Sequence, residues 1–456
     1  MNNKRNKVIY LPVQIKKRAF LAKLLLGYLS LKHGYSFVIG KRHSVKKVAL
    51  QGPDGIYLEK DFFGKKSEYF EKFKGRKMKF YGLDDEGLVF HDDVEYISRR
   101  VDYDSIKYME KVFAWGERQA NILKNFIGPQ TNSKVIIAGN PRIDILRGIG
   151  KSMYKKEIGY IKNKYNNFIL FNSFFALANG IKPFDLQVKR LKKMKKNISD
   201  EMIRYWINFY EYQKKLFDLI KEALLNLAED KSLNLIIRPH PNEKENTWIK
   251  IFKNFKNVKV TKKFDIFPWI YCSDVVIHNS CTTGVEAYLL GKNVIAYKPV
   301  ASKEFDLELP NILSTEVNDI NSLKAIIHEM LQNEYHEDKK TIENKKNVIN
   351  YNLHLSNRLS SEIMMEEFNH NPVYDNLNTF KKSYSDLTVN VFLKILYYAN
   401  KVVDLHLKNP HLINDFPPTG EKEVIFYLDR LNEYFKYNFK FAVTPLAASC
   451  FLVRKM

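Results

Sequence analysis

The sequence has few cysteines, and none of them stands in a metal-binding or redox pattern. Cys272, Cys281 and Cys450 are the only three in 456 residues. They form no CxxC pair, and three cysteines cannot all be paired with one another, which is typical of a protein in a reducing compartment. We therefore interpret all three as packing residues.

Patterns that hold metals, nucleotide phosphates or dinucleotides are also missing. No group of His, Cys and Asp has metal-ligand spacing, no GxxxxGK followed by Ser or Thr occurs, and no GxGxxG follows a strand pattern. Asp92 and Asp93 are the nearest thing to an acidic metal-binding pair, without a partner in the sequence. We expect no metal and no cofactor.

Long hydrophobic segments are absent too. The apolar run at residues 8–13 is followed by three basic residues at 16–18, so no secretory signal is visible. The apolar stretches at 20–31 and 441–453 are shorter than the ~20 residues of a membrane-spanning helix. The sequence predicts a cytoplasmic protein, and peripheral contact with an anionic inner membrane stays open.

The chain carries a large excess of positive charge, and its overall composition is that of a globular protein. Lys and Arg number 74 against 51 Asp and Glu, a formal net charge of +23, while 45% of the residues are hydrophobic. Such an excess attracts phosphates, nucleotides, anionic glycans or anionic lipids. The densest basic run, at residues 189–196, fits either a solvated helix face or a contact with an anionic lipid or acceptor.

The first third of the chain predicts a Rossmann-like lobe built on a parallel sheet. Strand patterns alternate there with helix or turn signals, as in βαβ units. They lie at residues 7–13, 36–40, 78–83, 111–115 and 134–138. We expect this N-terminal lobe to span residues 1–150.

A second Rossmann-like lobe is predicted over residues 151–345. Its first strand is separated from the others by a long helix at 200–230. The strand patterns lie at residues 168–172, 233–237, 258–261, 274–278 and 294–297. No further strand pattern follows, and we expect a mainly helical extension over residues 346–456. The fold class is thus α/β with two parallel-sheet lobes.

Three carboxylates follow the first lobe's strand pattern at 78–83. They are Asp84, Asp85 and Glu86, closed by Gly87, which permits a tight turn. Ligands meet a parallel sheet at its strand ends, and carboxylates this close together should raise at least one pKa. A carboxylate so tuned can take a proton from a sugar hydroxyl. An acidic surface turn is the alternative.

An Arg-Pro-His-Pro segment follows the strand pattern at 233–237. Two prolines flank His240 and fix the backbone on both sides, so that the imidazole is aimed. Beside Arg238, an aimed histidine suits a phosphate leaving group. A purely structural hydrogen bond of the histidine stays possible.

A hydroxyl-rich segment joins the strand pattern at 274–278 to the next helix. Hydroxyl groups, backbone N–H groups and the positive end of a helix dipole meet at such a start, which favours a phosphate or carboxylate site. Glu286 would reach a ribose hydroxyl pair. Helix capping without a ligand and a buried strand-end role for His278 are the alternatives. The segment is His278, Asn279, Ser280, Cys281, Thr282, Thr283 and Gly284.

Taken in series, these segments resemble the bacterial surface carbohydrate biosynthesis proteins of capsule and O-antigen assembly. More distantly, they resemble sialyltransferases and Kdo transferases that use CMP-activated donors. The likeness covers roughly residues 7–335 and departs at Gln14, where an acidic residue is expected. It also rests on Leu11-Pro12-Val13, Phe113-Ala114-Trp115-Gly116-Glu117, Gly139-Asn140-Pro141-Arg142 and Phe171-Asn172-Ser173.

The resemblance implies a GT-B glycosyltransferase that works without a metal. Its donor would be a CMP-activated acidic sugar, either Kdo or a nonulosonic acid such as sialic, pseudaminic or legionaminic acid. Its acceptor, held by the N-terminal lobe, would be a surface polysaccharide or glycolipid. Asp85 or Glu86 is then the catalytic carboxylate, and His240 serves the leaving group. The resemblance also implies donor contacts by Arg238, Pro241, His278, Asn279, Ser280, Thr282, Thr283 and Glu286, and acceptor or cleft positions for Asp84, Gly87, Asn140, Arg142 and Asn172.

Two other functions remain open at this point. A polyol-phosphate transferase of the CDP-glycerol type shares the Arg/His-Pro element and a Ser-rich helix start. A non-catalytic protein could instead bind anionic glycan or membrane through its charge alone. The sequence does not separate inversion from retention of the anomeric configuration. We expect no nucleic-acid partner.

Overall fold

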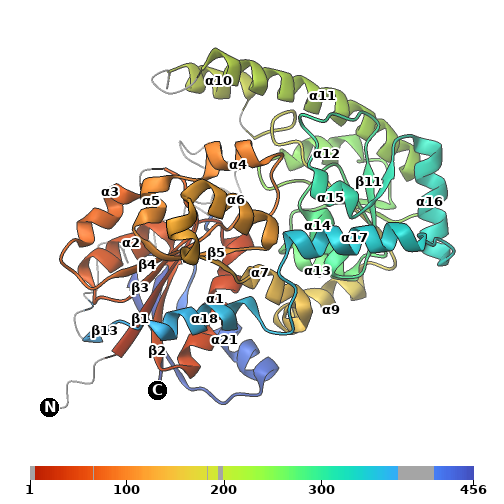
Figure 1. Ribbon diagram of the computed structural model, residues 1–456. Coiled ribbons are helices and arrows are strands. Elements are labelled where there is room, and N and C mark those ends of the chain that lie inside the picture. Colours follow the sequence, from red (N-terminus) through yellow and green to blue (C-terminus); the bar gives the residue numbers. More distant parts are fainter. Residues whose placement is uncertain (1–5, 65, 182, 194–198, 378–379, 381–414) are drawn as a thin grey trace. The chain divides into compact units, whose positions relative to one another are not determined.

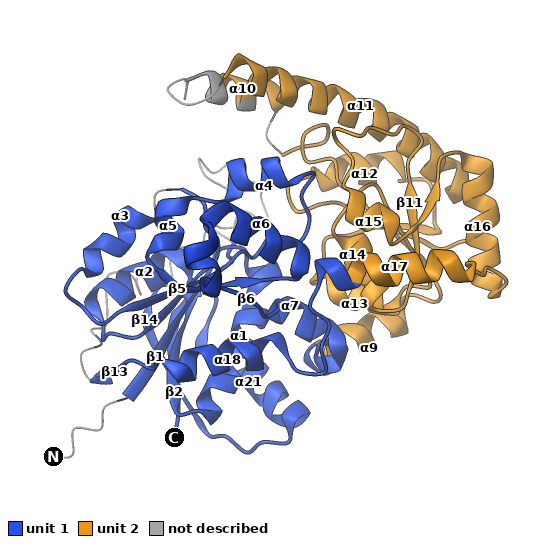
Figure 2. Cartoon of the chain, in the orientation of Figure 1, with its two compact units in different colours: residues 1–153, 350–456 blue, residues 154–349 orange. Residues whose placement is uncertain are grey.

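The computed structural model describes residues 6–64, 66–181, 183–193, 199–377, 380 and 415–456 (Figure 1). The chain divides into two compact units (Figure 2). Unit 1 comprises Met1–Met153 and Asn350–Met456, and unit 2 comprises Tyr154–Ile349. The segment after residue 350, which was expected to be a separate extension, is therefore part of unit 1.

Unit 1 is built on a sheet that has nine strands in the described residues. The order is β14-β15-β2-β1-β3-β4-β5-β6, and β13 (Tyr374–Asp375) pairs with β1. Neighbouring strands are parallel from β2 to β6. Their bounds are β1 (Asn6–Val13), β2 (Tyr35–Lys41), β3 (Ile56–Glu59), β4 (Lys79–Leu83), β5 (Met109–Ala114) and β6 (Val135–Ile137).

The strand order of unit 1 reverses at β1. The chain passes from β1 to β2 on one side and then to β3 on the other. In open parallel sheets, ligands bind outside the carboxyl ends of the strands at such a point. The loops after β1 and β3 are therefore where this sheet is expected to bind a ligand.

Helix α1 (Lys16–Lys32) is buried along most of its length. It packs on β2 and also contacts α7, α18 and α21, so apolar residues occupy almost its whole circumference. The apolar stretch at residues 20–31 is therefore a core helix. The other α-helices in the described residues of unit 1 are α2 (Arg42–Gln51), α3 (Ser67–Phe70), α4 (Asp93–Arg100), α5 (Tyr103–Lys107), α6 (Glu117–Ile127), α7 (Pro141–Asp144), α8 (Gly150–Met153), α18 (Ser360–His370) and α21 (Glu421–Phe435).

The end of the chain adds a hairpin to this sheet, where a mainly helical segment was expected. Strands β14 (Phe441–Ala447) and β15 (Cys450–Lys455) pair with each other, and β15 pairs antiparallel with β2. The hairpin turn lies beside the end of β2, where the Lys41 N–H donates to the Ser449 carbonyl oxygen at 2.9 Å. The hairpin thus holds the strand end that leads into α2.

We predict that Gly40→Ala weakens the docking of this hairpin. A Cβ at residue 40 would lie 2.0 Å from the Ser449 carbonyl oxygen, and the backbone φ of +156° also disfavours an L side chain. We expect the free energy of unfolding to fall by about 3 kcal/mol or more, as measured by urea denaturation. Gly64→Ala is the control, because its φ is +75° but nothing lies within 4 Å. Equal losses for both variants would contradict the steric argument.

Unit 2 has a six-stranded sheet in the described residues, and all its neighbouring strands are parallel. The order is β12-β11-β10-β7-β8-β9, so the strand order reverses between β7 and β10. The bounds are β7 (Ile169–Asn172), β8 (Leu235–Arg238), β9 (Val258–Val260), β10 (Val275–His278), β11 (Asn293–Tyr297) and β12 (Thr315–Val317).

Both faces of the unit 2 sheet are covered by helices, which explains why its strands are continuous apolar runs. Ile169 and Phe171 of β7 face a core around Trp248, whereas Leu170 faces a core around Trp269. The helices in the described residues of unit 2 are α9 (Lys155–Lys164), α10 (Phe184–Lys193), α11 (Asp200–Glu229), α12 (Glu245–Ile251), α13 (Ile266–Cys272), α14 (Thr283–Leu289), α15 (Glu308–Ile312), α16 (Ile320–Gln332) and α17 (Lys339–Asn352), whose last turn enters unit 1. The basic run at 189–196 extends beyond α10 into residues outside the described ranges.

Candidate functional site

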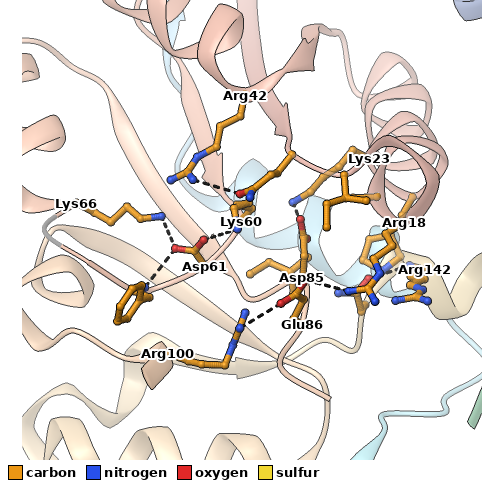
Figure 3. Close-up of a pocket in the computed structure, with 18 of the residues that line it drawn as sticks. Arg18, Lys23, Arg42, Lys60, Asp61, Lys66, Asp85, Glu86, Arg100 and Arg142 are labelled. Atoms are coloured by element: carbon orange, nitrogen blue, oxygen red, sulfur yellow. Dashed lines mark hydrogen bonds and ion pairs between the residues drawn. The ribbon is translucent and has the colours of Figure 1, made fainter. Parts of the chain in front are cut away.

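A pocket of about 330 Å³ opens at the carboxyl ends of the unit 1 strands (Figure 3). Its walls come from the segments after β1, β2, β3, β4 and β6, which meet where the strand order reverses. Its volume lies in the range of small-molecule sites. Among the site residues predicted from the sequence, Asp85, Glu86, Asn140 and Arg142 line it.

Asp84 does not face this pocket, although the sequence placed it there. Its side chain is completely buried, and Arg100 donates from Nε to its Oδ2 at 2.7 Å. The Tyr96 hydroxyl donates to the same oxygen at 3.3 Å, and the Glu86 N–H donates to Oδ1 at 3.1 Å. The first of the three carboxylates therefore holds the turn in shape, and its oxygens are already occupied.

Asp85 is the carboxylate that the turn presents to the pocket. Its side chain is 18% exposed, and its Oδ1 lies 3.4 Å from Nζ of the buried Lys23. Burial raises the pKa of the Asp85 carboxyl above its usual range, and the cations of Lys23 and Lys60 offset this only in part. A raised pKa favours proton uptake, as a general base requires.

Glu86 has the opposite electrostatic environment. Arg18 Nη1 lies 2.9 Å from one of its oxygens, and Arg100 Nη1 lies 3.2 Å from the other. Burial alone would raise the pKa of Glu86, but Arg18 and Arg100 outweigh it and hold the pKa below its usual range. Glu86 therefore suits the positioning of cations better than proton uptake.

Gly87 lies behind the pocket wall and allows a close approach of another side chain. A Cβ there would lie 2.1 Å from Nε2 of Gln119. Gln119 in turn accepts from the Trp115 N–H at 2.7 Å, and the Trp115 indole donates to the Asp84 carbonyl oxygen at 2.6 Å. The glycine therefore serves packing behind the acidic turn rather than contact with a ligand.

Asn140 and Arg142 lie in the pocket wall at the start of α7. The Asn140 Oδ1 accepts from the Arg142 N–H at 2.9 Å and so caps this short helix. The cap fixes the segment after β6, from which Arg142 reaches the pocket rim. A role of Asn140 as a ligand contact is thus secondary to its role as a cap.

Asn172, predicted as an acceptor or cleft position at a strand end of the second lobe, lies in unit 2. It ends β7 between Arg238 of β8 and His278 of β10, at the reversal of the strand order. It is only 4% exposed, and neither its Oδ1 nor its Nδ2 has a hydrogen-bond partner in the described residues. An unsatisfied buried amide costs about 1–3 kcal/mol, which a ligand at this strand end would relieve.

His240 is held by a carboxylate that the sequence reasoning missed. The His240 N–H donates to Glu243 at 3.2 Å, and the imidazole Nδ1 accepts from the Asn242 N–H at 3.2 Å. The second bond places the proton of the neutral ring on Nε2. These two hydrogen bonds therefore orient His240 in addition to its two flanking prolines.

Glu243 is completely buried and joins two loops at the strand ends of unit 2. It accepts hydrogen bonds from the Ser173 hydroxyl and the Phe175 N–H at 2.8 Å, and from the Trp248 indole at 3.1 Å. Its position three residues after His240 is the signal in the sequence that could have revealed it.

The guanidinium of Arg238 forms hydrogen bonds within unit 2. Its guanidinium donates to the carbonyl oxygens of Lys263 at 2.6 Å and Phe264 at 3.2 Å. Burial lowers the pKa of Arg238 to about 10, so it stays charged at neutral pH. Pro241 is exposed at the end of this turn.

The hydroxyl-rich segment of unit 2 is largely tied into the interior. His278 is fully buried, with Nε2 2.8 Å from the Ser314 hydroxyl, and burial lowers its pKa to about 3. Asn279 accepts from the Phe174 N–H at 3.0 Å. The Ser280 hydroxyl accepts from Nδ2 of Asn311 at 2.7 Å. These three residues therefore shape the loop and have their main contacts within the protein.

Thr282, Thr283 and Glu286 remain at the start of α14. Thr282 is half-buried and precedes the helix, and the buried Thr283 hydroxyl has no hydrogen-bond partner in the described residues. Glu286 is buried in the first turn. Of the sequence-predicted anion site, Thr282 and Thr283 are thus the hydroxyl residues whose side chains form no hydrogen bond within the described part of the chain, at the start of the helix that follows β10.

The described part of the chain has neither a cluster of metal-ligating side chains nor a helix that could span a membrane. No group of three or more His, Cys, Asp or Glu side chains there is placed so that it could hold a metal ion. Within the same residues, each helix is too short or too polar to span a lipid bilayer.

Comparison with known proteins gives a fold but no family. No family model matches the sequence, and a search of curated proteins finds no relative. Among solved structures, the wall teichoic acid polymerase TagF has a TM-score of 0.50 at 9% identity, over 80% of this chain and 88% of that one. UDP-GlcNAc 2-epimerase from Methanocaldococcus jannaschii gives a TM-score of 0.49 at 13% identity, over 80% and 99%. The enzyme of the same name from Neisseria meningitidis gives 0.46 at 15%, over 80% and 100%. The likeness to TagF confirms the predicted α/β GT-B fold class.

Proposed function

We propose that the protein is a glycosyltransferase of surface polysaccharide or glycolipid biosynthesis that uses a CMP-activated acidic sugar. The observation that carries this proposal is Asp85, a carboxylate of raised pKa in a polar pocket at the strand reversal of unit 1. Unit 2 supports it with unsatisfied polar groups at its own strand reversal. An acceptor in unit 1 and a nucleotide donor in unit 2 match these two features.

In this reaction Asp85 accepts the proton of the acceptor hydroxyl. The hydroxyl oxygen forms a bond to the anomeric carbon, and the bond from that carbon to the CMP phosphate oxygen breaks. His240 carries its proton on Nε2 and donates a hydrogen bond to the leaving phosphate as charge develops there. Asn172, Thr282 and Thr283 contact the donor.

A second candidate is the transfer of a polyol phosphate from a CDP-linked donor. The fold likeness to the wall teichoic acid polymerase favours it. The same two sets of residues would serve, because a hydroxyl is again deprotonated, but the leaving group is then CMP displaced from phosphorus.

Donor consumption separates the two candidates. The purified protein is incubated with CMP-sialic, CMP-pseudaminic and CMP-legionaminic acids, with CMP-Kdo generated in situ, and with CDP-glycerol, each with a glycan acceptor. CMP release from an acidic-sugar donor supports the first proposal. Turnover of CDP-glycerol alone supports the second, and no turnover of any donor contradicts both.

Nucleotide binding gives a simpler prediction. CMP at 100 times its Kd should stabilise the folded protein by about 2.7 kcal/mol, seen as a rise in Tm. Asn172→Leu should abolish this rise and leave the Tm of the unliganded protein unchanged or higher, because it removes an unsatisfied buried amide. Asn254→Leu, at an exposed position of unit 2, is the control. An intact CMP response in Asn172→Leu would remove this residue from the site.

A further inference from the structure

The unit 1 pocket has far more cations in its wall than a single catalytic carboxylate requires. Eight Lys and Arg side chains line it, against three carboxylates, Asp61, Asp85 and Glu86. We call these eight the cationic wall. They are Arg18, Lys23, Arg42, Lys60, Lys66, Arg99, Arg100 and Arg142.

Internal ion pairs account for part of this charge. Arg100 pairs with Asp84, and Lys60 and Lys66 pair with Asp61. Behind the wall, the buried Glu59 lies 3.4 Å from Arg42. Arg99 pairs with Glu95 at 2.8 Å. Even with Asp84, Glu59 and Glu95 counted, eight cations face six carboxylates. A concave site with such an excess concentrates anions.

One member of the wall is a buried ammonium group without a hydrogen bond. Lys23 is 1% exposed, and its Nζ has no hydrogen-bond partner in the described residues, with Asp85 at 3.4 Å as its ion-pair partner. Figure 3 shows Lys23, Lys60 and Arg18 around the turn that carries Asp85 and Glu86. A buried ammonium beside the pocket gains most from an anionic ligand atom.

We infer that the acceptor carries an oxyanion, a carboxylate or a phosphate, next to the hydroxyl that reacts, and that the cationic wall binds this group. Calling the ligand an acceptor rests on the proposed function, whereas binding of the oxyanion does not. The wall leaves Asp85 access to the hydroxyl while its cations hold the neighbouring acidic group. A neutral sugar offers these cations hydroxyl oxygens but no negative charge, so the pocket favours acidic glycans.

The test is equilibrium binding by calorimetry without any donor, with three probes. Sialic acid methyl glycoside supplies a carboxylate, glycerol 3-phosphate supplies a phosphate, and methyl galactoside is neutral. We expect at least one acidic probe to bind at least tenfold more tightly than the neutral one, and its binding to weaken as salt is raised. The acidic probe that binds more tightly identifies the oxyanion.

Arg18→Gln and Lys60→Gln should each weaken binding of the acidic probe at least tenfold. Lys72→Gln removes an exposed charge of unit 1 outside the pocket and should leave binding unchanged. Two variants are used so that a folding defect in one leaves the other informative. Equal binding of the neutral and acidic probes, or unchanged binding in both pocket variants, would overturn the inference.

CMP binding to the same preparations separates this inference from the proposed function. A CMP-induced rise in Tm together with no preference for acidic probes removes the acidic acceptor and leaves the transferase. Preference for acidic probes together with no nucleotide response removes the CMP-dependent transferase and leaves an oxyanion-binding pocket.

Discussion

Replacing Asp85 with asparagine should lower the rate of transfer by about 10²–10⁴-fold, the contribution of a positioned general base. The substitution keeps the shape of the side chain and removes its capacity to accept a proton. Asp85 is the carboxylate of the acidic turn that both faces the pocket and has a raised pKa. The rate constant kcat with the active donor and acceptor is the measurement, and CMP binding by unit 2 should be unchanged.

The pH profile tests the role of Asp85 more directly. Only the deprotonated carboxyl accepts the hydroxyl proton, so the rate falls as pH decreases through its pKa. Burial raises that pKa, so the fall begins at higher pH than for an exposed aspartate of pKa ~3.9. Lys60→Gln removes a cation that lowers the pKa of Asp85, and should move the acidic limb to still higher pH.

Glu86→Gln is the matched control for Asp85→Asn. Arg18 and Arg100 hold the pKa of Glu86 low, so we expect a loss of about tenfold or less from weaker positioning. Should Asp85→Asn unfold because Lys23 loses its ion-pair partner, Asp85→Asn combined with Lys23→Met removes both buried charges together. A folded double variant with the wild-type rate would refute the assignment.

Glu243→Gln should destabilise unit 2 by about 3 kcal/mol or more, because it breaks a buried network. The carboxylate accepts on one oxygen from the Phe175 and His240 N–H groups, and on the other from the Trp248 indole. Glutamine has only one acceptor oxygen. Its NH₂ group, a donor, would therefore face N–H groups that are donors as well. Urea denaturation followed by fluorescence measures the loss.

Glu229→Gln is the control for this prediction, since it changes an exposed carboxylate of the same unit. It should alter the free energy of unfolding by less than about 0.5 kcal/mol. Because Glu243 also holds the His240 turn, its replacement should weaken CMP binding and leave oxyanion binding in unit 1 intact. Similar stability of the two variants would show that the network is not what holds these loops.

The sequence predicted the acidic turn correctly in position because a strand end is a local pattern. The pattern could not rank its three carboxylates, because their neighbours come from other parts of the chain. Lys23 is the one charged residue in the buried stretch 19–31 of α1, and Lys60 follows a four-residue strand that the pattern did not reveal. Only the fold brings both to Asp85.

The hydroxyl-rich segment has internal hydrogen-bond partners that its composition did not reveal. Its composition favoured an anion site, but Ser280 and His278 form hydrogen bonds to Asn311 and Ser314, about 30 residues later. A hydroxyl group can form hydrogen bonds within the protein as readily as with a ligand. The sequence alone does not show which of the two it forms. Strand β15 was missed because four of its six residues are buried in succession, which hides the alternation of a strand.

The pairing of β15 with β2 fixes the order in which a ribosome can complete the two units. Unit 2 is one continuous stretch and can fold once its own residues have emerged. Strand β2 emerges early, but its partner strand β15 (residues 450–455) is synthesised last. Until then it offers a free edge to other chains. The unit that begins synthesis first is therefore the last to be finished, and the β2 edge can pair with other chains for the whole of that interval.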